Sequence, residues 1–275
     1  MPNARETFNS LLTEAVREYV ERGFTSIERL NYWTERLRRS AIATMMPGQR
    51  IEEITRQHMQ AILKREIDRG GLLKLHPGVP GFRLKDVRPK LRGELDRRVR
   101  AAADLIVLDK QAAVEKTIQR FSGWLSSIPP GGTRAADKMK VKEDIRKPMS
   151  SLPFNERRVL IDQGHKFTQN LSEIIALDNG ALAGHWVSHY EQPGYNYRPE
   201  HKHFDVDDKF FIVRDNWAMK KGLMRKGEYR YTDEIEKPGE LVFCRCYYVW
   251  IYNLASLPDD MLTAKGKAVL QEELV

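Results

Sequence analysis

The residues with the clearest capacity for chemistry are the only two cysteines, Cys244 and Cys246, which stand one residue apart in an aromatic run. Four of the seven histidines lie between positions 185 and 203, and His201 and His203 repeat the one-residue spacing of the cysteines. Residues two apart in a β-strand project from the same face, so each pair would present two ligand atoms together. We therefore predict a tetrahedral zinc site of Cys244, Cys246, His201 and His203. The alternative is that the thiols are small buried groups and the histidines only form hydrogen bonds.

Asp205 adds a carboxylate two residues after His203. His201, His203 and Asp205 together fit the metal site of a metal-dependent nuclease or other hydrolase. Aspartate is also typical of a turn between strands, where its side chain bonds to the local backbone. The sequence has no GxxxxGK[ST], GxGxxG or GxSxG pattern, so nothing in it supports a P-loop, a dinucleotide-binding turn or a serine nucleophile elbow.

Arg245 lies between the two cysteines and points to the opposite face if residues 241–252 form one strand. A charged side chain in mid-strand requires a carboxylate partner or a solvated face. We expect one of Asp205, Asp207 and Asp208 to supply that carboxylate in a fold-stabilising ion pair.

The elements that must position these residues differ between the two halves of the chain. Apolar residues recur at three- and four-residue spacing from Phe8 to Val20, which predicts an amphipathic helix. Similar patterns predict helices from Ile27, from about Ile51 to Asp68 and from about Pro89 to Leu125. The Pro/Gly-rich segment 127–133 is the strongest break. We predict a helical module over residues 1–130, a linker over 131–152, an α+β domain over 153–257 and a helical tail over 258–275.

The second half changes character after Gln192. Short alternating runs occur near Phe204 and over 209–214, and the β-branched and aromatic residues 241–252 predict a closing strand. The predicted fold class is α+β, with a basic helical N-terminal module and a compact C-terminal domain that contains a small antiparallel sheet.

Charge is unevenly distributed along the chain. Residues 1–150 hold 30 Lys and Arg against 19 Asp and Glu, whereas the remainder holds 16 against 19. The basic excess suggests a surface for non-specific DNA or for an acidic partner protein, with a solvated helical surface as the alternative. The candidate contact residues are Arg83, Lys85, Arg88, Lys90, Arg92, Arg97, Arg98 and Arg100.

Composition also indicates where the chain is made. Two cysteines are too few to staple a chain of this size, which predicts a reducing, cytosolic origin. There is no apolar run of about 18 residues, so we predict no membrane span. Acidic residues near the N-terminus do not fit a secretory signal.

The order of the motifs resembles a known protein family. Trp186-Val187-Ser188 is followed by Arg198, His201, Phe204 and Asp205, then by Pro238-Gly239-Glu240, and finally by Cys244-Arg245-Cys246. This order, over about residues 154–255, is similar to the tailed-phage head-morphogenesis family, the minor head proteins that resemble the F protein of phage Mu. The chain departs from that family at Val206, where members usually have Gly, and at Leu241, where many have His before Cys-Arg-Cys.

The resemblance implies a minor structural protein of a phage head, made in the host cytoplasm and located in the virion. Such a protein associates with portal, connector and capsid proteins and acts in head assembly and in DNA packaging or ejection. We also expect structural roles for Arg198, Asp205 and Arg245, no catalytic residues and no obligatory cofactor. A metal-dependent nuclease with a basic DNA-binding arm remains the alternative, and a plain DNA-binding accessory protein is a third possibility.

Overall fold

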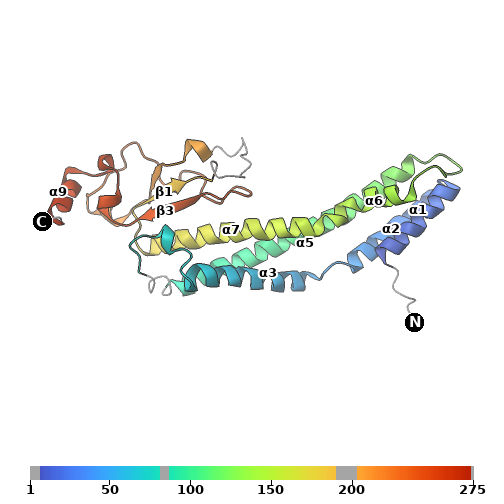
Figure 1. Cartoon of the computed structure of the whole chain (residues 1–275), viewed down its shortest axis with the longest axis horizontal. Coiled ribbons are helices and arrows are strands. Elements are labelled where there is room, and N and C mark those ends of the chain that lie inside the picture. Colours follow the sequence, from blue (N-terminus) through green and yellow to red (C-terminus); the bar gives the residue numbers. More distant parts are fainter. Residues whose placement is uncertain (1–6, 81–86, 190–202, 274–275) are drawn as a thin grey trace. The chain divides into compact units, whose positions relative to one another are not determined.

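The chain folds into two units, each built from two separate stretches of sequence. The computed structural model describes residues 7–80, 87–189 and 203–273 (Figure 1). The helical unit comprises residues 1–55 and 100–160, and the sheet unit comprises residues 56–99 and 161–275. Helices dominate, and the sheet unit contains a three-stranded antiparallel sheet, so the predicted α+β class is confirmed.

The helical unit has its core between α1 (Phe8–Arg22), α2 (Ile27–Ala43), α6 (Lys138–Ser150) and part of α5 (Arg88–Ser126). Helix α1 packs against both α2 and α6 (Figure 1). Trp33 of α2 and Phe121 of α5 are fully buried against it. The apolar stripe predicted for the first helix is buried throughout, at Phe8, Leu11, Leu12, Ala15, Val16, Tyr19 and Val20.

The turn between α1 and α2 follows from local sequence. Gly23 ends α1 with a φ of +72°, in the left-handed region that glycine adopts most easily. A Cβ at this position would lie 2.6 Å from the backbone nitrogen of Gly132. Ser26 then caps α2, because its hydroxyl accepts a hydrogen bond from the backbone N–H of Arg29 at 3.2 Å.

Helix α6 occupies most of the segment 131–152 for which a linker was expected. Asp137 caps its first turn by accepting from the N–H groups of Met139 and Lys140. Ile145 is 2% exposed in the core of the helical unit, and Val141 and Met149 pack beside it. Apolar residues four apart are therefore enough to dock this helix, although lysines dominate its composition.

Three long helices contribute to both units. They are α3 (Gly48–Leu63), which continues into a π-helical turn at Lys64–Asp68, α5 and α7 (Leu152–Asp178). Among the residues that the structure describes, no helix combines the length and apolar character needed to cross a membrane.

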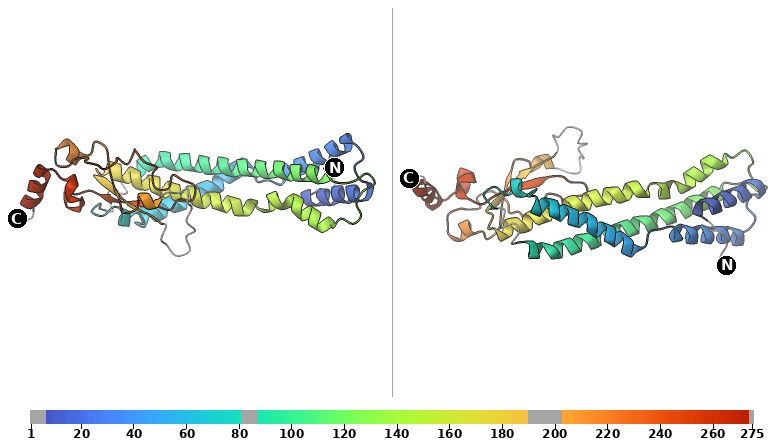
Figure 2. Two further views of the ribbon diagram at one scale, coloured as in Figure 1. Left: turned by 90° about the horizontal axis from the view of Figure 1, so that it is seen from above. Right: turned by 60° about the horizontal axis from the view of Figure 1, so that its bottom comes forward.

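The sheet unit is organised around strands β1 (Ala183–Val187), β2 (Phe210–Ile212) and β3 (Tyr247–Ile251), in the order β2-β1-β3. The C-terminal part of α7 runs beside the sheet (Figures 1 and 2), where Trp250 of β3 donates a hydrogen bond to Ser172 of α7 at 3.0 Å. The short elements are η2 (Leu73–Leu75), η3 (His203–Asp205), α8 (Trp217–Lys220), η4 (Leu254–Ser256), η5 (Asp259–Met261) and α9 (Ala264–Glu273).

Alternating side chains cover both faces of the sheet. Ile212 and Ile251 pack into one apolar cluster with the C-terminal elements. Trp186, Tyr248 and Trp250 pack into a second cluster on the other face, which also contains Cys244 and Cys246. The two cysteines therefore belong to the core of the sheet unit, as buried apolar groups would.

The closing strand is shorter than predicted. Residues 241–246 were expected to lie within it, but pairing with β1 starts only at Tyr247, opposite Val187. Phe243 has a φ of +61°, and the N–H of Cys244 bonds to the carbonyl of Leu241 at 3.1 Å, so the chain turns here. Aromatic and β-branched composition predicted the strand but could not show this left-handed residue.

Candidate metal-binding site

The structure brings three of the four predicted ligands together. One ligand atom each from His203, Cys244 and Cys246 lies within 4.8 Å of the other two. Nδ1 of His203 is 3.0 Å from Sγ of Cys246 and 3.7 Å from Sγ of Cys244. The three residues are 8%, 2% and 2% exposed. His201, the fourth predicted ligand, lies outside the described residues.

His203 is held by the short helix η3 and by the sheet. Its ring meets the ring of Trp186 edge-on, with centroids 5.6 Å apart. Its carbonyl accepts from the N–H of Val206 at 3.3 Å, which closes the turn leading toward β2. An imidazole packed against an indole and facing two sulfurs has few alternative rotamers, so its nitrogen is preoriented toward them.

The cysteines are held by the turn that precedes β3. Gly239 donates its N–H to Sγ of Cys244 at 3.2 Å. Gly239 has a φ of +81°, and a Cβ there would lie 2.9 Å from Cγ of Gln169, so this position requires glycine. Sγ of Cys246 lies 3.6 Å from Oγ of Ser188, just beyond β1.

Helix α7 fixes this turn from the other side. Asp162 is 7% exposed and accepts a hydrogen bond from the N–H of Phe243 at 2.5 Å. Lys166 lies one helical turn further, 3.4 Å from the same carboxylate, and Gln163 donates to it at 3.2 Å. Sequence analysis missed Asp162, because a single carboxylate on a helix gives no motif.

The two thiols differ in their protonation. The hydrogen bond from Cys244, opposed by burial and aided by His203, lowers the pKa of Cys246. The same contact with Cys246, together with burial, raises the pKa of Cys244. Cys246 is therefore the thiol that gives up its proton more readily. A thiolate is the form of cysteine that binds metals.

Two further histidines lie near Cys246. Burial lowers the pKa of His165 and of His189, so both rings are neutral near pH 7. His165, on α7, bonds to the backbone of Cys246, and its Nε2 is buried without a hydrogen-bond partner. Sequence analysis also missed His165, whose place on an amphipathic helix carries no metal-binding pattern.

The donor set fits zinc. Two sulfurs and one imidazole nitrogen, all buried, are ligands that Zn²⁺ prefers, and a tetrahedral site would need one more. His203, Cys244 and Cys246 would hold the ion, which would join η3 to the turn before β3. Such a centre links segments about 40 residues apart in sequence, as structural zinc sites do.

The structure places Asp205 and Arg245 differently from the prediction. Both are exposed, and the expected ion pair between Arg245 and Asp205, Asp207 or Asp208 is absent among these described residues. Asp207 accepts instead from the N–H of Ser188, and Asp208 pairs with His185. Arg245 lies outside β3, where solvent can hydrate its charge, so it needs no carboxylate. Arg198 lies outside the described residues.

The predicted basic contact residues fall into three groups. Arg97 and Arg98 both pair with Glu94, and Lys90 pairs with Asp178. Arg92 and Arg100 are exposed on α5. Arg83 and Lys85, like the side chain of Arg88, lie outside the part of the chain that the structure describes. Of the described candidates, Arg92 and Arg100 are therefore the better placed to meet a phosphate.

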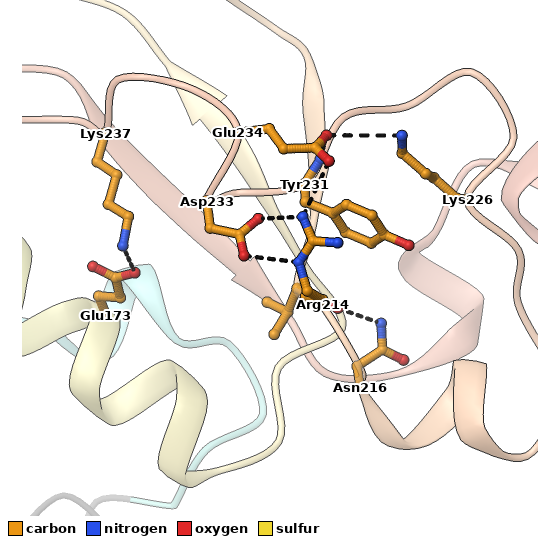
Figure 3. Close-up of polar contacts among 9 residues, drawn as sticks. Glu173, Arg214, Asn216, Lys226, Tyr231, Asp233, Glu234 and Lys237 are labelled. Atoms are coloured by element: carbon orange, nitrogen blue, oxygen red, sulfur yellow. Dashed lines mark hydrogen bonds and ion pairs between the residues drawn. The ribbon is translucent and has the colours of Figure 1, made fainter.

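A charged cleft of about 620 Å³ adjoins the turn that carries the cysteines. Lys237 at its rim pairs with Glu173 of α7 at 2.5 Å (Figure 3). Glu94, which also lines the cleft, accepts hydrogen bonds from Arg98 and from Asn170, each at 2.9 Å. The charges on the cleft wall thus already form pairs within the wall, which makes the cleft a weak candidate for binding an ion.

Arg214 ties the loop after α8 to the end of β2. Its guanidinium bonds to both oxygens of Asp233 at 2.8 and 2.9 Å and to Glu234 at 3.0 Å (Figure 3). It also stacks on the ring of Tyr231, 3.9 Å from the centroid. An arginine with this many partners orders a loop and has few donors left for a ligand.

A serine–histidine pair elsewhere in the sheet unit is structural. Nε2 of His76 is 3.1 Å from Oγ of Ser172, and its Nδ1 is 2.6 Å from the hydroxyl of Tyr252. His76 and Ser172 are each 1% exposed, and Ser172 also accepts from Trp250. Because no substrate can reach Ser172, the network serves to hold η2 against β3 and α7.

Comparison with known proteins gives no relative for this chain: no family model, curated protein or solved structure matches it.

Proposed function

We propose that the chain is a minor structural protein of a tailed-phage head that acts with the portal or connector in head assembly and in DNA packaging or ejection. The observation that carries this proposal is the burial of Cys244 and Cys246 with His203. The Cys-Arg-Cys turn is the most specific motif of the resemblance. Its place inside the core suits a part that stabilises a fold.

We further propose that the cluster holds a structural zinc ion. The ion would join η3, the turn at 239–246 and, through that turn, α7. In a small sheet of three short strands, such a link adds to the stability that the apolar clusters on both faces supply. A stable, independently folded sheet unit is a reasonable requirement for a protein built into a particle.

The nuclease alternative receives less support from the geometry. A catalytic metal must admit a phosphodiester and a water molecule. His203 is 8% exposed and its ring meets that of Trp186 edge-on, whereas Asp205 is exposed and is not part of the cluster. Of the two described residues that were predicted for a nuclease site, only His203 belongs to the cluster with the cysteines.

Contact with DNA or with an acidic portal surface would fall to exposed cations. On α5 these are Arg92 and Arg100, and α6 adds Lys140, Arg146 and Lys147. Lysine and arginine side chains of this kind bind phosphates without sequence preference and lose affinity steeply as salt rises.

Quantitative cross-linking mass spectrometry on purified particles of the source phage tests the proposal. We expect the chain at a few to a dozen copies, with links to a portal or connector protein. Absence from particles would contradict the head-protein proposal. Metal-dependent cleavage of duplex DNA that is lost in His203→Ala but kept in His185→Ala would support the nuclease instead.

A further inference from the structure

The two thiols lie close enough together to react with each other. Cys244 and Cys246 are both free, and their Sγ atoms lie within 4.8 Å of one another beside the same nitrogen of His203. Among the described residues, the sheet ladder ends at the pair Val187–Tyr247, and none of them pairs with residues 244–246 as a strand. A disulfide between residues two apart is most strained within a regular strand, and residues 244–246 lie outside the ladder.

We propose that Cys244 and Cys246 form a reversible intramolecular disulfide, which makes the Cys-Arg-Cys turn an oxidation site. With hydrogen peroxide as oxidant, one sulfur displaces water from the peroxide and becomes a sulfenic acid. The other sulfur then displaces a second water and forms the S–S bond. Two thiols lose one hydrogen each, and one peroxide becomes two waters.

The disulfide would be easily reduced. Its ring contains only one intervening residue, and such small rings depart from relaxed disulfide geometry, which makes the bond a good oxidant. Both cysteines are 2% exposed, so a small uncharged oxidant such as hydrogen peroxide is the reagent that can reach their sulfurs. The strained bond would therefore be reversible once a reducing thiol gains access to it.

Oxidation would change the surroundings of the turn. A disulfide uses both sulfurs, which removes two of the three described zinc donors. It also competes with the hydrogen bond from Gly239 to Cys244. Gly239 and Lys237 border the charged cleft, where Lys237 pairs with Glu173 (Figure 3). Because the disulfide and a zinc ion would use the same two sulfurs, the oxidised and the metal-bound states exclude each other.

Mass spectrometry of the intact full-length chain tests this inference. Reduced protein, freed of metal with a chelator, is treated with hydrogen peroxide and then alkylated with iodoacetamide in denaturant. We expect the wild type to lose two hydrogens, to take up no alkyl group, to stay monomeric and to recover both thiols with dithiothreitol. Cys244→Ser and Cys246→Ser, which each keep one thiol, cannot show this mass loss. Full alkylation after peroxide, added oxygens without hydrogen loss, or disulfide-linked dimers would each overturn the inference.

A second arm separates this inference from the zinc proposal on which its regulatory meaning rests. The same oxidation is run after addition of Zn²⁺, with Mg²⁺ as the control ion. If both proposals hold, Zn²⁺ slows disulfide formation at least several-fold and Mg²⁺ does not. Disulfide formation at the same rate with Zn²⁺ contradicts the zinc site alone, and Zn²⁺ binding without any disulfide in the metal-free chain contradicts the disulfide alone.

Discussion

Asp162 of α7 accepts a hydrogen bond from the backbone N–H of Phe243, the residue that precedes Cys244, although 81 positions separate the two in sequence. This contact makes a helix carboxylate responsible for the shape of the turn that presents both cysteines. The left-handed φ of +61° at Phe243 is tolerable because the surrounding structure fixes it.

Removing the carboxylate of Asp162 should destabilise the sheet unit. We expect Asp162→Ala to lower the free energy of unfolding by about 2 kcal/mol, because a hydrogen bond to a buried charged group is lost. Asp162→Asn keeps an acceptor oxygen of the same shape and should lose less. Urea unfolding measures both. An Asp162→Ala variant as stable as the wild type would show that Asp162 does not hold the turn.

His76 should make stability depend on pH. Burial lowers its pKa from 6.5 to about 4, so the folded state binds fewer protons than the unfolded state between these values. The contribution of the neutral ring is complete above pH 6.5 and declines as the pH falls toward 4, by about 3 kcal/mol in total.

Unfolding measured from pH 7 to pH 4 checks this prediction. The wild type should lose stability on acidification, and His76→Gln should show a flatter pH profile. Tyr252→Phe is the matched control, because it removes the partner hydroxyl at 2.6 Å but keeps the titrating ring. If stability falls with pH as steeply in His76→Gln as in the wild type and in Tyr252→Phe, the pH dependence comes from other groups.

Gly184 in β1 and Gly93 in α5 give opposite predictions for substitution by alanine. A Cβ at Gly184 would lie 2.8 Å from the ring of Tyr248, so we expect Gly184→Ala to destabilise the sheet unit by about 2 kcal/mol. Gly93, in α5, has nothing within 4 Å of such a Cβ. Gly93→Ala should stabilise by about 0.5–1 kcal/mol through helix propensity. Thermal unfolding of the two variants measures whether stability falls in Gly184→Ala and rises in Gly93→Ala. A Gly184→Ala variant as stable as the wild type would refute the close contact with Tyr248.

The sequence predicted more of the helices than of the site. The apolar stripe of α1, the break after α5 and the alternating run over 209–214, which contains β2 (Phe210–Ile212), were all visible in residue spacing. Helix α6 was missed because a three-residue stripe is hidden among lysines. The clustering of His203 with Cys244 and Cys246 was predictable from their residue types and spacing. Asp162 and His165 reach the turn only through tertiary packing, which no local sequence pattern records.

Exposed arginines should dominate any affinity for DNA. The double variant Arg92→Gln/Arg100→Gln should weaken binding to duplex DNA of any sequence and reduce the slope of log affinity against log salt by up to about two, because each lost phosphate contact contributes about 0.9. Arg97→Gln, whose side chain pairs with Glu94, is the control and should leave the slope unchanged. An equal effect of the control and the double variant would contradict this assignment of contacts.

Metal content tests the central proposal most directly. The full chain, purified without chelator, is analysed for zinc, and its thermal unfolding is followed as Zn²⁺ is added. We predict one zinc per chain, and a gain of about 2.7 kcal/mol in stability when free zinc reaches about 100 times its dissociation constant. Cys246→Ser and His203→Gln should lose both effects, whereas Asp205→Asn should keep them. Zinc near zero in the wild type, with no shift in unfolding on addition, would contradict a structural metal centre at His203, Cys244 and Cys246.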